Sequence, residues 1–299
     1  MWTQENIGNQ SGKTVIVTGG NTGIGYETAL ALYKTGASVI IGCRDKEKAD
    51  KAIQEMQAII SGGSLEAAIL DLSSLQSVKE FSDTFKSNYS SLDLLINNAG
   101  VMTPPVSKTK DGYELQFGVN FLGHFALTGQ LYPLLKSTAG SRIVTVTSLA
   151  YLSGKIDFDN LKSERDYDAF REYCQSKLAC LLFTSELQKR IDAKGDSVLS
   201  LASHPGVTAT DLSRHMSQEA FAAAIERFGE LMPTTQGALP SLYAAASDMV
   251  KGAGLYGPDG PGNLKGYPAF TETLFDADAP EIAKQLWEKA EQITAVVFP

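Results

Sequence analysis

Cysteine and histidine are both scarce in this sequence, with three of each among 299 residues. The cysteines are odd in number and lie within segments that we expect to be strands or helices. This argues against a disulfide framework and favours a reducing compartment, by default the cytoplasm. The histidines are scattered without the spacing of metal ligands, so we expect no metal site. These residues are Cys43, Cys174, Cys180, His124, His204 and His215.

An excess of basic charge and long apolar runs are also missing. Acidic residues outnumber basic ones by 34 to 26, and a net charge of -8 does not attract a phosphate backbone, so we expect no nucleic-acid partner. No stretch approaches the ~18 uninterrupted apolar residues of a membrane span. The first residues, Met1 to Gly8, have neither the basic nor the apolar part of a signal peptide. We therefore expect a soluble protein that does not engage a membrane.

What the sequence does contain is a regular alternation of short apolar runs with longer amphipathic segments. The runs are typical of buried strands and the segments between them carry helical periodicity. This alternation predicts an α/β fold with a doubly wound parallel sheet of the Rossmann type. No linker, repeat or charge run divides the chain, so we expect residues 1–299 to form a single domain. The predicted strands are 14–17, 38–41, 65–70, 92–96, 143–146 and 198–202.

A glycine-rich loop follows the first predicted strand. Gly19, Gly23 and Gly25 lie between that strand and a helical segment at 26–34. Glycine permits positive φ and close backbone approach, while the first helical amides and the helix dipole attract a pyrophosphate. A glycine-rich loop alone could be a tight turn, but its position between strand and helix predicts a dinucleotide site.

Three Tyr-x-x-x-Lys pairs compete for a catalytic role, namely Tyr132/Lys136, Tyr151/Lys155 and Tyr173/Lys177. The first pair ends an apolar helical stretch, where packing and a C-terminal cation explain it. The second straddles a Ser-Gly step, which predicts a loop that does not stack residues four apart. The third lies in an uninterrupted helical pattern, so both its side chains share one face. We therefore choose Tyr173 and Lys177.

Several further motifs follow one another along the chain in a fixed order. They are Thr18 to Gly25, Asn97-Asn98-Ala99-Gly100, Ser148, Tyr173-x-x-Ser176-Lys177 and Pro205-Gly206. In order and context they resemble the short-chain dehydrogenase/reductase superfamily over about residues 13 to 256. Three features, Gly42-Cys43-Arg44-Asp45, the stretch 119–125 and the long gap between Ser148 and Tyr173, resemble its retinol dehydrogenase-like branch.

The resemblance implies hydride transfer between a nicotinamide and a carbonyl or alcohol, with four catalytic residues. Tyr173 is the proton donor, and we expect an ammonium about 4 Å away to lower the pKa of its phenol toward neutral. Lys177 also holds the nicotinamide ribose. Ser148 donates to the substrate oxygen, with Thr147 as the weaker alternative. Asn120 holds a water that relays protons to Lys177.

The resemblance also implies the residues that line the nucleotide, with Asp71 and Leu72 beside the adenine. Asn97 and its neighbour Asn98 could instead serve chiefly to tie strands together. The expected nucleotide-binding residues are Gly19, Asn21, Thr22, Gly23, Ile24, Gly25, Arg44, Asp71, Leu72, Asn97, Ala99, Gly100, Tyr173, Lys177, Pro205, Gly206, Val207 and Thr208.

The end of the second predicted strand favours NADP(H) over NAD(H). NAD-specific sites usually carry a carboxylate there, whereas a 2′-phosphate needs a cation. Here Cys43 is followed by Arg44, whose guanidinium can grip a phosphate bidentately. Asp45 is better explained as the cap of the next helix.

Two further expectations concern shape and assembly. The stretch 207–232 follows the sixth predicted strand and turns from polar to apolar and helical, so we expect a substrate lid, with a surface helix pair as the alternative. The stretch Leu115 to Leu135 is apolar on more than one face. The resemblance favours a homodimer or homotetramer built on it; the alternative is a monomer in which Pro280 to Thr294 covers it.

These observations predict an NADP(H)-dependent oxidoreductase whose partner is a small, mostly apolar carbonyl or alcohol substrate. The alternative is a regulatory protein that senses NADP(H) by binding it without turnover. The complete set of Ser148, Tyr173 and Lys177 argues for the enzyme.

Overall fold

The computed structural model describes residues 1–210, 212 and 218–299. Within these residues eight strands form one sheet in the order β3-β2-β1-β4-β5-β6-β7-β8. Neighbouring strands are parallel as far as β7, and β8 runs antiparallel to β7. The strands are β1 Thr14–Thr18, β2 Ser38–Cys43, β3 Ser64–Ile69, β4 Leu94–Asn97, β5 Arg142–Val146, β6 Leu199–Ser203, β7 Leu255–Pro258 and β8 Pro268–Thr271.

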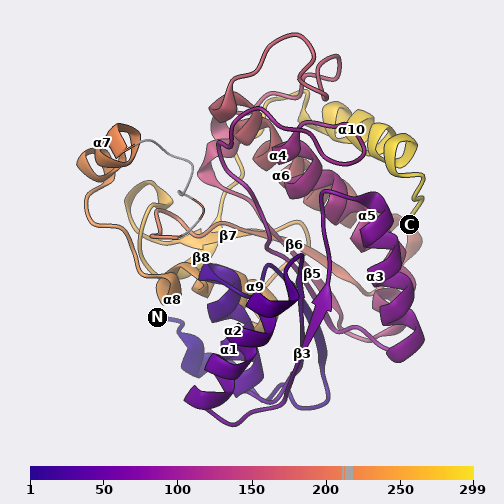
Figure 1. Cartoon of the computed structure of the whole chain (residues 1–299), viewed down its shortest axis with the longest axis vertical. Coiled ribbons are helices and arrows are strands. Elements are labelled where there is room, and N and C mark those ends of the chain that lie inside the picture. Colours follow the sequence, from indigo (N-terminus) through magenta and orange to yellow (C-terminus); the bar gives the residue numbers. More distant parts are fainter. Residues whose placement is uncertain (211, 213–217) are drawn as a thin grey trace.

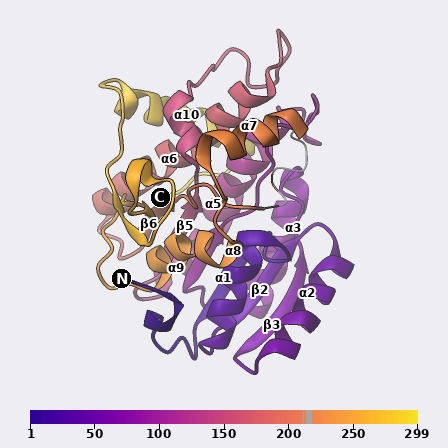
Figure 2. The same ribbon diagram turned by 90° about the vertical axis from the view of Figure 1, so that its left-hand side faces the viewer.

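Helices cover both faces of this sheet (Figures 1 and 2). On one face, α1, α2 and α9 cover the core cluster that contains Val15 of β1. On the other face, α3, α5 and α6 cover the cluster that contains Ile16, and α10 packs against α6. The helices are α1 Gly23–Lys34, α2 Lys46–Ile59, α3 Leu75–Asn88, α4 Leu115–Phe117, a π-helix Gly118–Leu122, α5 Gly123–Ser137, α6 Ala169–Lys194, α7 Gln218–Phe228, α8 Thr234–Gly237, α9 Leu239–Ala246 and α10 Ala279–Thr294, with 3-10 turns at Gln4–Asn6, Leu149–Ser153 and Pro261–Asn263.

The order of the strands indicates at which edge of the sheet a ligand would bind. After β1 the chain moves outward to β2 and β3, and it then returns to the other side of β1 as β4. Doubly wound sheets bind ligands at the carboxyl ends of the strands where the order reverses. Thr18 ends β1 and Asn97 ends β4, so the two loops that follow them flank this position.

The predicted fold class is confirmed, and each predicted strand overlaps one of β1 to β6. The sequence did not reveal β7 and β8, because both are short and contain proline. Pro268 is tolerated because β8 is an edge strand, and Pro258 lies at the end of β7, beyond the last pair of that strand with β6 at Tyr256.

The apolar stretch proposed as an oligomer face is covered by the chain's own C-terminal part. Trp287 of α10 lies with its ring centroid 5.0 Å from that of Phe125 on α5 and 5.9 Å from that of Phe183 on α6. Phe298 closes the same cluster at 4.8 Å from Trp287. This packing favours the monomer alternative, while the oligomeric state itself stays a prediction.

In the part of the chain that is described, no helix has the length and apolar character needed to cross a membrane.

Candidate active site

The glycine-rich loop adopts a conformation that only glycine accommodates well. Gly19 and Gly23 have φ of 66° and 57°. A Cβ atom at Gly25 would lie 2.3 Å from the Gly19 carbonyl oxygen, so α1 and the loop approach more closely than a side chain allows. At Gly23 the nearest side-chain atom would be 3.9 Å away, on Thr210. The first amides of α1 follow Gly23 directly, where a helix N-terminus attracts an anionic group.

The Asn97-Asn98-Ala99-Gly100 loop lies beside the glycine-rich loop, and hydrogen bonds from its asparagines to neighbouring elements hold it. Asn97 donates through Nδ2 to the Thr128 hydroxyl at 3.1 Å. Asn98 donates through Nδ2 to the Thr18 carbonyl oxygen at 2.8 Å. The side-chain amide donors of both asparagines are thus used within the fold, as the alternative explanation that they tie strands together expects. The backbone of Gly100 runs close to Lys177, since a Cβ there would be 3.7 Å from Lys177 Nζ.

Ser148, Tyr173 and Lys177 meet at the carboxyl end of β5. Ser148 follows that strand, accepts a hydrogen bond from the Ala150 amide at 3.2 Å, and forms a hydrogen bond with the Tyr173 hydroxyl. Lys177, one turn after Tyr173 on α6, has its Nζ 5.9 Å from the tyrosine ring centroid. Its ammonium donates to the Val146 carbonyl oxygen at 3.0 Å.

Thr147, the weaker alternative to Ser148, is committed elsewhere. Its side chain is 2% exposed and its hydroxyl donates to the backbone carbonyl oxygen of Lys177 at 2.7 Å. Thr147 therefore supports α6, while Ser148 is the hydroxyl that reaches Tyr173.

The expected lowering of the Tyr173 pKa is wrong for this geometry. Burial raises the pKa of the phenol, and the hydrogen bond with Ser148 opposes that rise only in part. Burial also lowers the pKa of the Lys177 ammonium. Both shifts have one cause, because a buried site of low polarity disfavours the charged form of each group.

The other two tyrosine–lysine pairs serve the fold. Tyr132 donates through its hydroxyl to Asp196 at 2.8 Å, and Lys136 pairs with the same carboxylate at 2.9 Å. Tyr151 is buried in the 3-10 turn Leu149–Ser153, which ends before Lys155. The choice of the third pair agrees with this geometry.

Asn120 lies in the π-helix, and both polar atoms of its side chain are hydrogen-bonded, with Oδ1 accepting from one donor. Its Oδ1 accepts from the Val101 amide at 2.9 Å, and its Nδ2 donates to the Val101 carbonyl oxygen at 3.0 Å and to the Ser176 hydroxyl at 2.9 Å. Asn120 therefore fixes the loop after Gly100 against α6. Its carbonyl oxygen also has two donors, His124 and Cys180.

The adenine end of the site offers one unpaired cation. Arg44, directly after β2, is exposed, and its side chain forms no hydrogen bond or ion pair with any of the described residues. Asp45 caps α2 by accepting from the Lys48 amide at 3.2 Å, as its helix-cap explanation predicted. Burial alone would raise the pKa of Asp71, but hydrogen bonds from Ser73 and Lys110 lower it overall.

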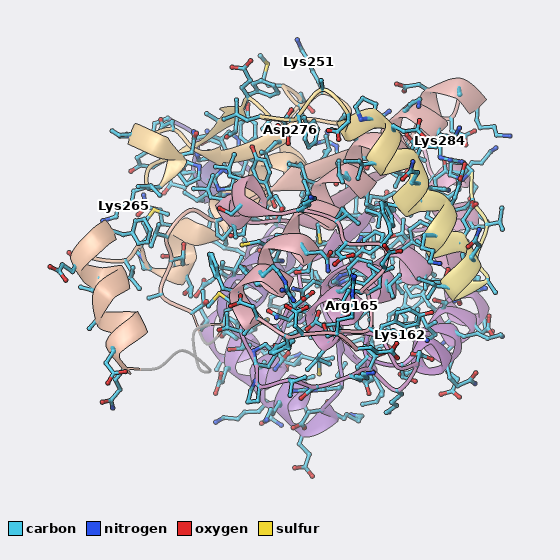
Figure 3. The ribbon with its side chains drawn as sticks, turned by 90° about the horizontal axis from the view of Figure 1, so that it is seen from above. Lys162, Arg165, Lys251, Lys265, Asp276 and Lys284 are labelled. Carbon is cyan, nitrogen blue, oxygen red and sulfur yellow. The ribbon has the colours of Figure 1, made fainter. Side chains whose placement is uncertain are left out.

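The segment Pro205 to Thr208 turns sharply below the predicted lid. Gly206 has φ of 65°, and a Cβ atom on it would lie 2.2 Å from the Leu264 carbonyl oxygen. Met232 pairs with Thr208 in a β-bridge that closes the base of the lid segment. From this base α7 stands away from the body of the protein, with Lys265 beside it (Figure 3). Part of the predicted lid, residues 211 and 213–217, lies outside the described residues.

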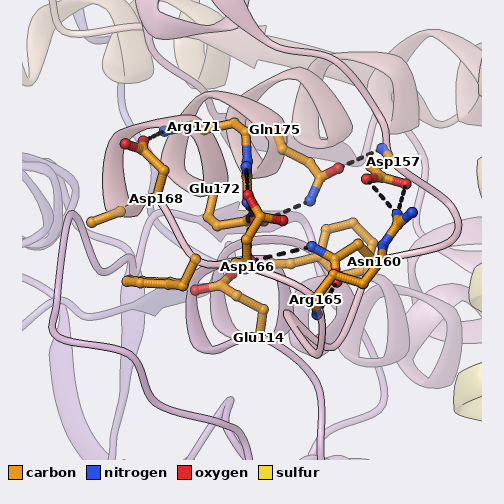
Figure 4. Close-up of polar contacts among 12 residues, drawn as sticks. Glu114, Asp157, Asn160, Arg165, Asp166, Asp168, Arg171, Glu172 and Gln175 are labelled. Atoms are coloured by element: carbon orange, nitrogen blue, oxygen red, sulfur yellow. Dashed lines mark hydrogen bonds and ion pairs between the residues drawn. The ribbon is translucent and has the colours of Figure 1, made fainter.

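Sequence reasoning missed a polar network that precedes Tyr173 (Figure 4). Glu114 is fully buried and caps α4, and burial raises its pKa to about 7 despite two backbone hydrogen bonds. Glu172 is 2% exposed and accepts from Arg171 and from Gln175. The only sequence signal was a carboxylate placed directly before an apolar helix. The network anchors the long segment between Ser148 and α6.

Outside the segment 213–217 and residue 211, no group of three or more His, Cys, Asp or Glu side chains is arranged to hold a metal ion.

This constellation, a glycine loop after β1 and a Ser–Tyr–Lys set at the end of β5, defines a nucleotide-dependent dehydrogenase. The chain belongs to the short-chain dehydrogenase family, whose model matches residues 13–220. It is an NAD(P)-dependent oxidoreductase of the retinol dehydrogenase-like branch.

Its relatives fix that branch. The chain is 40% identical over 294 residues to Retinol dehydrogenase 13 of Homo sapiens, covering 96% of this chain and 86% of that protein. It is 45% identical over 237 residues to human Retinol dehydrogenase 11, covering 79% and 74%. An uncharacterized protein from Mycobacterium Paratuberculosis superimposes with a TM-score of 0.83 at 38% identity, covering 100% and 99% of the two chains.

Proposed function

We propose that this protein is an NADP(H)-dependent carbonyl reductase or alcohol dehydrogenase for a mostly apolar aldehyde, ketone or alcohol. The observation that carries the proposal is the hydrogen bond between Ser148 and Tyr173 with Lys177 one turn away, at the same sheet edge as the glycine loop. A protein that only senses the nucleotide needs no such proton donor.

The residues present fit a nicotinamide nucleotide. An ammonium has three N–H donors, and Lys177 uses one of them, on Val146, within the described chain. The remaining donors can hold the ribose of the nicotinamide. When bound, the nicotinamide supplies or accepts the hydride.

The chain's own groups then manage the oxygen and its proton. As the hydride reaches a carbonyl carbon, negative charge develops on the oxygen. Tyr173, whose raised pKa keeps it protonated, gives its proton to that oxygen, and Ser148 stabilises the same oxygen by a hydrogen bond. Asn120 holds the loop and, in this proposal, a water that resupplies protons toward Lys177.

The preference for NADP(H) rests on Arg44. It is exposed at the end of β2, while the nearby carboxylate of Asp45 is occupied as a helix cap. A guanidinium is therefore free to bind a 2′-phosphate, and no carboxylate in this cap competes for a ribose hydroxyl.

An apolar substrate is supported by the names of the relatives, since retinol is an apolar alcohol. We propose that the segment 207–232, which includes α7, closes over it as a lid. The described cysteines are all free and buried, in keeping with a reducing compartment such as the cytoplasm.

Purified protein should be screened with NADPH and NADH against aldehydes and ketones graded by length, including retinal. The proposal requires nucleotide oxidation by at least one carbonyl, faster with NADPH than with NADH. Tight NADPH binding without turnover across the panel would instead support the sensor. The variant Tyr173→Phe serves as the catalytic control.

A further inference from the structure

A single buried imidazole, His124, joins the end of β1 to the Asn120 turn. His124 is 2% exposed, with Nε2 2.8 Å from the Thr18 hydroxyl and Nδ1 3.0 Å from the Asn120 carbonyl oxygen. Because a carbonyl oxygen only accepts, Nδ1 must donate. Burial lowers the pKa of His124 to about 4, so the ring is neutral and Nε2 accepts the proton of the Thr18 hydroxyl.

The Thr18 hydroxyl is then completely used. Its oxygen accepts from the backbone amides of Asn98 and Ala99, each at 2.9 Å. The alternative acceptor for its proton, the Ile96 carbonyl oxygen, is farther away at 3.4 Å. Thr18 thus holds the loop after β4 through its hydroxyl oxygen. His124 fixes the direction of that hydroxyl by accepting its proton.

On its other side His124 holds the π-helix Gly118–Leu122. In a π-helix the amide ladder is widened, and the Asn120 carbonyl oxygen takes side-chain donors from His124 and, at 3.2 Å, from the Cys180 thiol. A thiol is a weak donor, so the imidazole is the stronger of the two. The side chain of Asn120 meanwhile clamps Val101.

We propose that His124 is a positioning residue that couples the phosphate loop, through Thr18, to Asn120 of the catalytic set. His124 does not reach the reacting atoms itself; it sets the loop 98–101 from both ends. Its effect on turnover rests on the proposed function, whereas its effect on the loop and on nucleotide binding does not.

The test uses variants that remove one hydrogen bond at a time. Thr18→Val keeps the shape and loses the hydroxyl, Thr18→Ser keeps the hydroxyl, and His124→Phe keeps an aromatic ring without nitrogen. The matched control is Thr184→Val, because Thr184 is fully buried and its hydroxyl donates to the Cys180 carbonyl oxygen at 3.0 Å rather than to His124. The readouts are NADPH dissociation constant, kcat, melting temperature, and amide exchange of peptides covering 97–101 in nucleotide-free protein.

Thr18→Val and His124→Phe should each weaken NADPH binding by about 10-fold or more and speed exchange in this peptide. The double variant should be within about 2-fold of the worse single variant, because both remove the same connection. Thr18→Ser should restore most of the affinity. Thr184→Val should lower the melting temperature alone.

Melting temperatures that fall while NADPH affinity and loop exchange stay at wild-type values would show a purely structural histidine and overturn the proposal. Losses that multiply in the double variant would also overturn it. If NADPH binds normally but no form of the protein turns over a carbonyl, the proposed function fails, and binding and exchange still decide the role of His124.

Discussion

Replacing Tyr173 by phenylalanine separates chemistry from stability in this site. The substitution removes one hydroxyl, whose partner is Ser148, from a side chain that is 5% exposed. Losing such a hydrogen bond costs about 0.5–1.5 kcal/mol of folding free energy. Against a typical stability of about 5–15 kcal/mol, the variant remains folded.

The loss of activity should be much larger than this change in stability allows. A positioned proton donor contributes about 10²-fold or more to the rate, equivalent to about 3 kcal/mol of barrier. We therefore expect kcat to fall by about 100-fold or more. NADPH binding should change little, because the phenol hydroxyl is needed for proton transfer and not for holding the nucleotide.

The matched control is Tyr132→Phe, which removes a hydroxyl of the same kind from the first tyrosine–lysine pair. Tyr132 is 4% exposed and donates to Asp196, so its loss should lower the melting temperature and leave kcat unchanged. Steady-state rates and calorimetry on both variants decide the matter. If Tyr173→Phe keeps more than about a tenth of wild-type kcat, the assignment of the acid is refuted.

Four other outcomes follow. Arg44→Ala should weaken NADPH binding by about 10- to 150-fold and NADH binding far less in titrations; equal losses would reopen the NAD(H) alternative. Because burial raises the pKa of Tyr173, carbonyl reduction should stay level through neutral pH and alcohol oxidation should accelerate as pH rises; pH–rate profiles in both directions check this. Glu114 has its pKa raised from 4.5 to about 7, so its contribution to stability is present below the unfolded value and is lost as pH rises through the folded value. Glu114→Gln should therefore flatten the urea-derived stability between about pH 5 and about pH 8, by at most ~3 kcal/mol; an unchanged slope would contradict this. Light scattering across micromolar concentrations should give a monomer mass if α10 is the cover of α5 and α6, and a stable dimer would restore the oligomer prediction.

The sequence predicts the sheet well because its strands are buried on both faces. Strands such as β1, in which every residue from Thr14 to Thr18 is buried, appear as continuous Val and Ile runs that no surface helix would carry. The glycine loop and the third tyrosine–lysine pair are local patterns of the same kind, since each depends on residues a turn or a loop apart. Strands β7 and β8 escaped because their proline and glycine obscure the pattern.

The sequence could not show how deeply segments distant in the chain bury the catalytic side chains. This burial sets the direction of the pKa shifts of Tyr173 and Lys177. The charge of Lys177 was expected to lower the Tyr173 pKa, but that argument counted the nearby charge without the opposing effect of burying the phenol. In the folded chain the side chains of Tyr173 and Lys177 are only 5% and 4% exposed, so burial has the largest effect on the pKa of each. A neutral tyrosine beside a buried lysine still suits carbonyl reduction, because the reaction needs a phenol that holds its proton until charge develops on the substrate oxygen. The buried arrangement therefore changes how the site was expected to work without removing the role assigned to Tyr173.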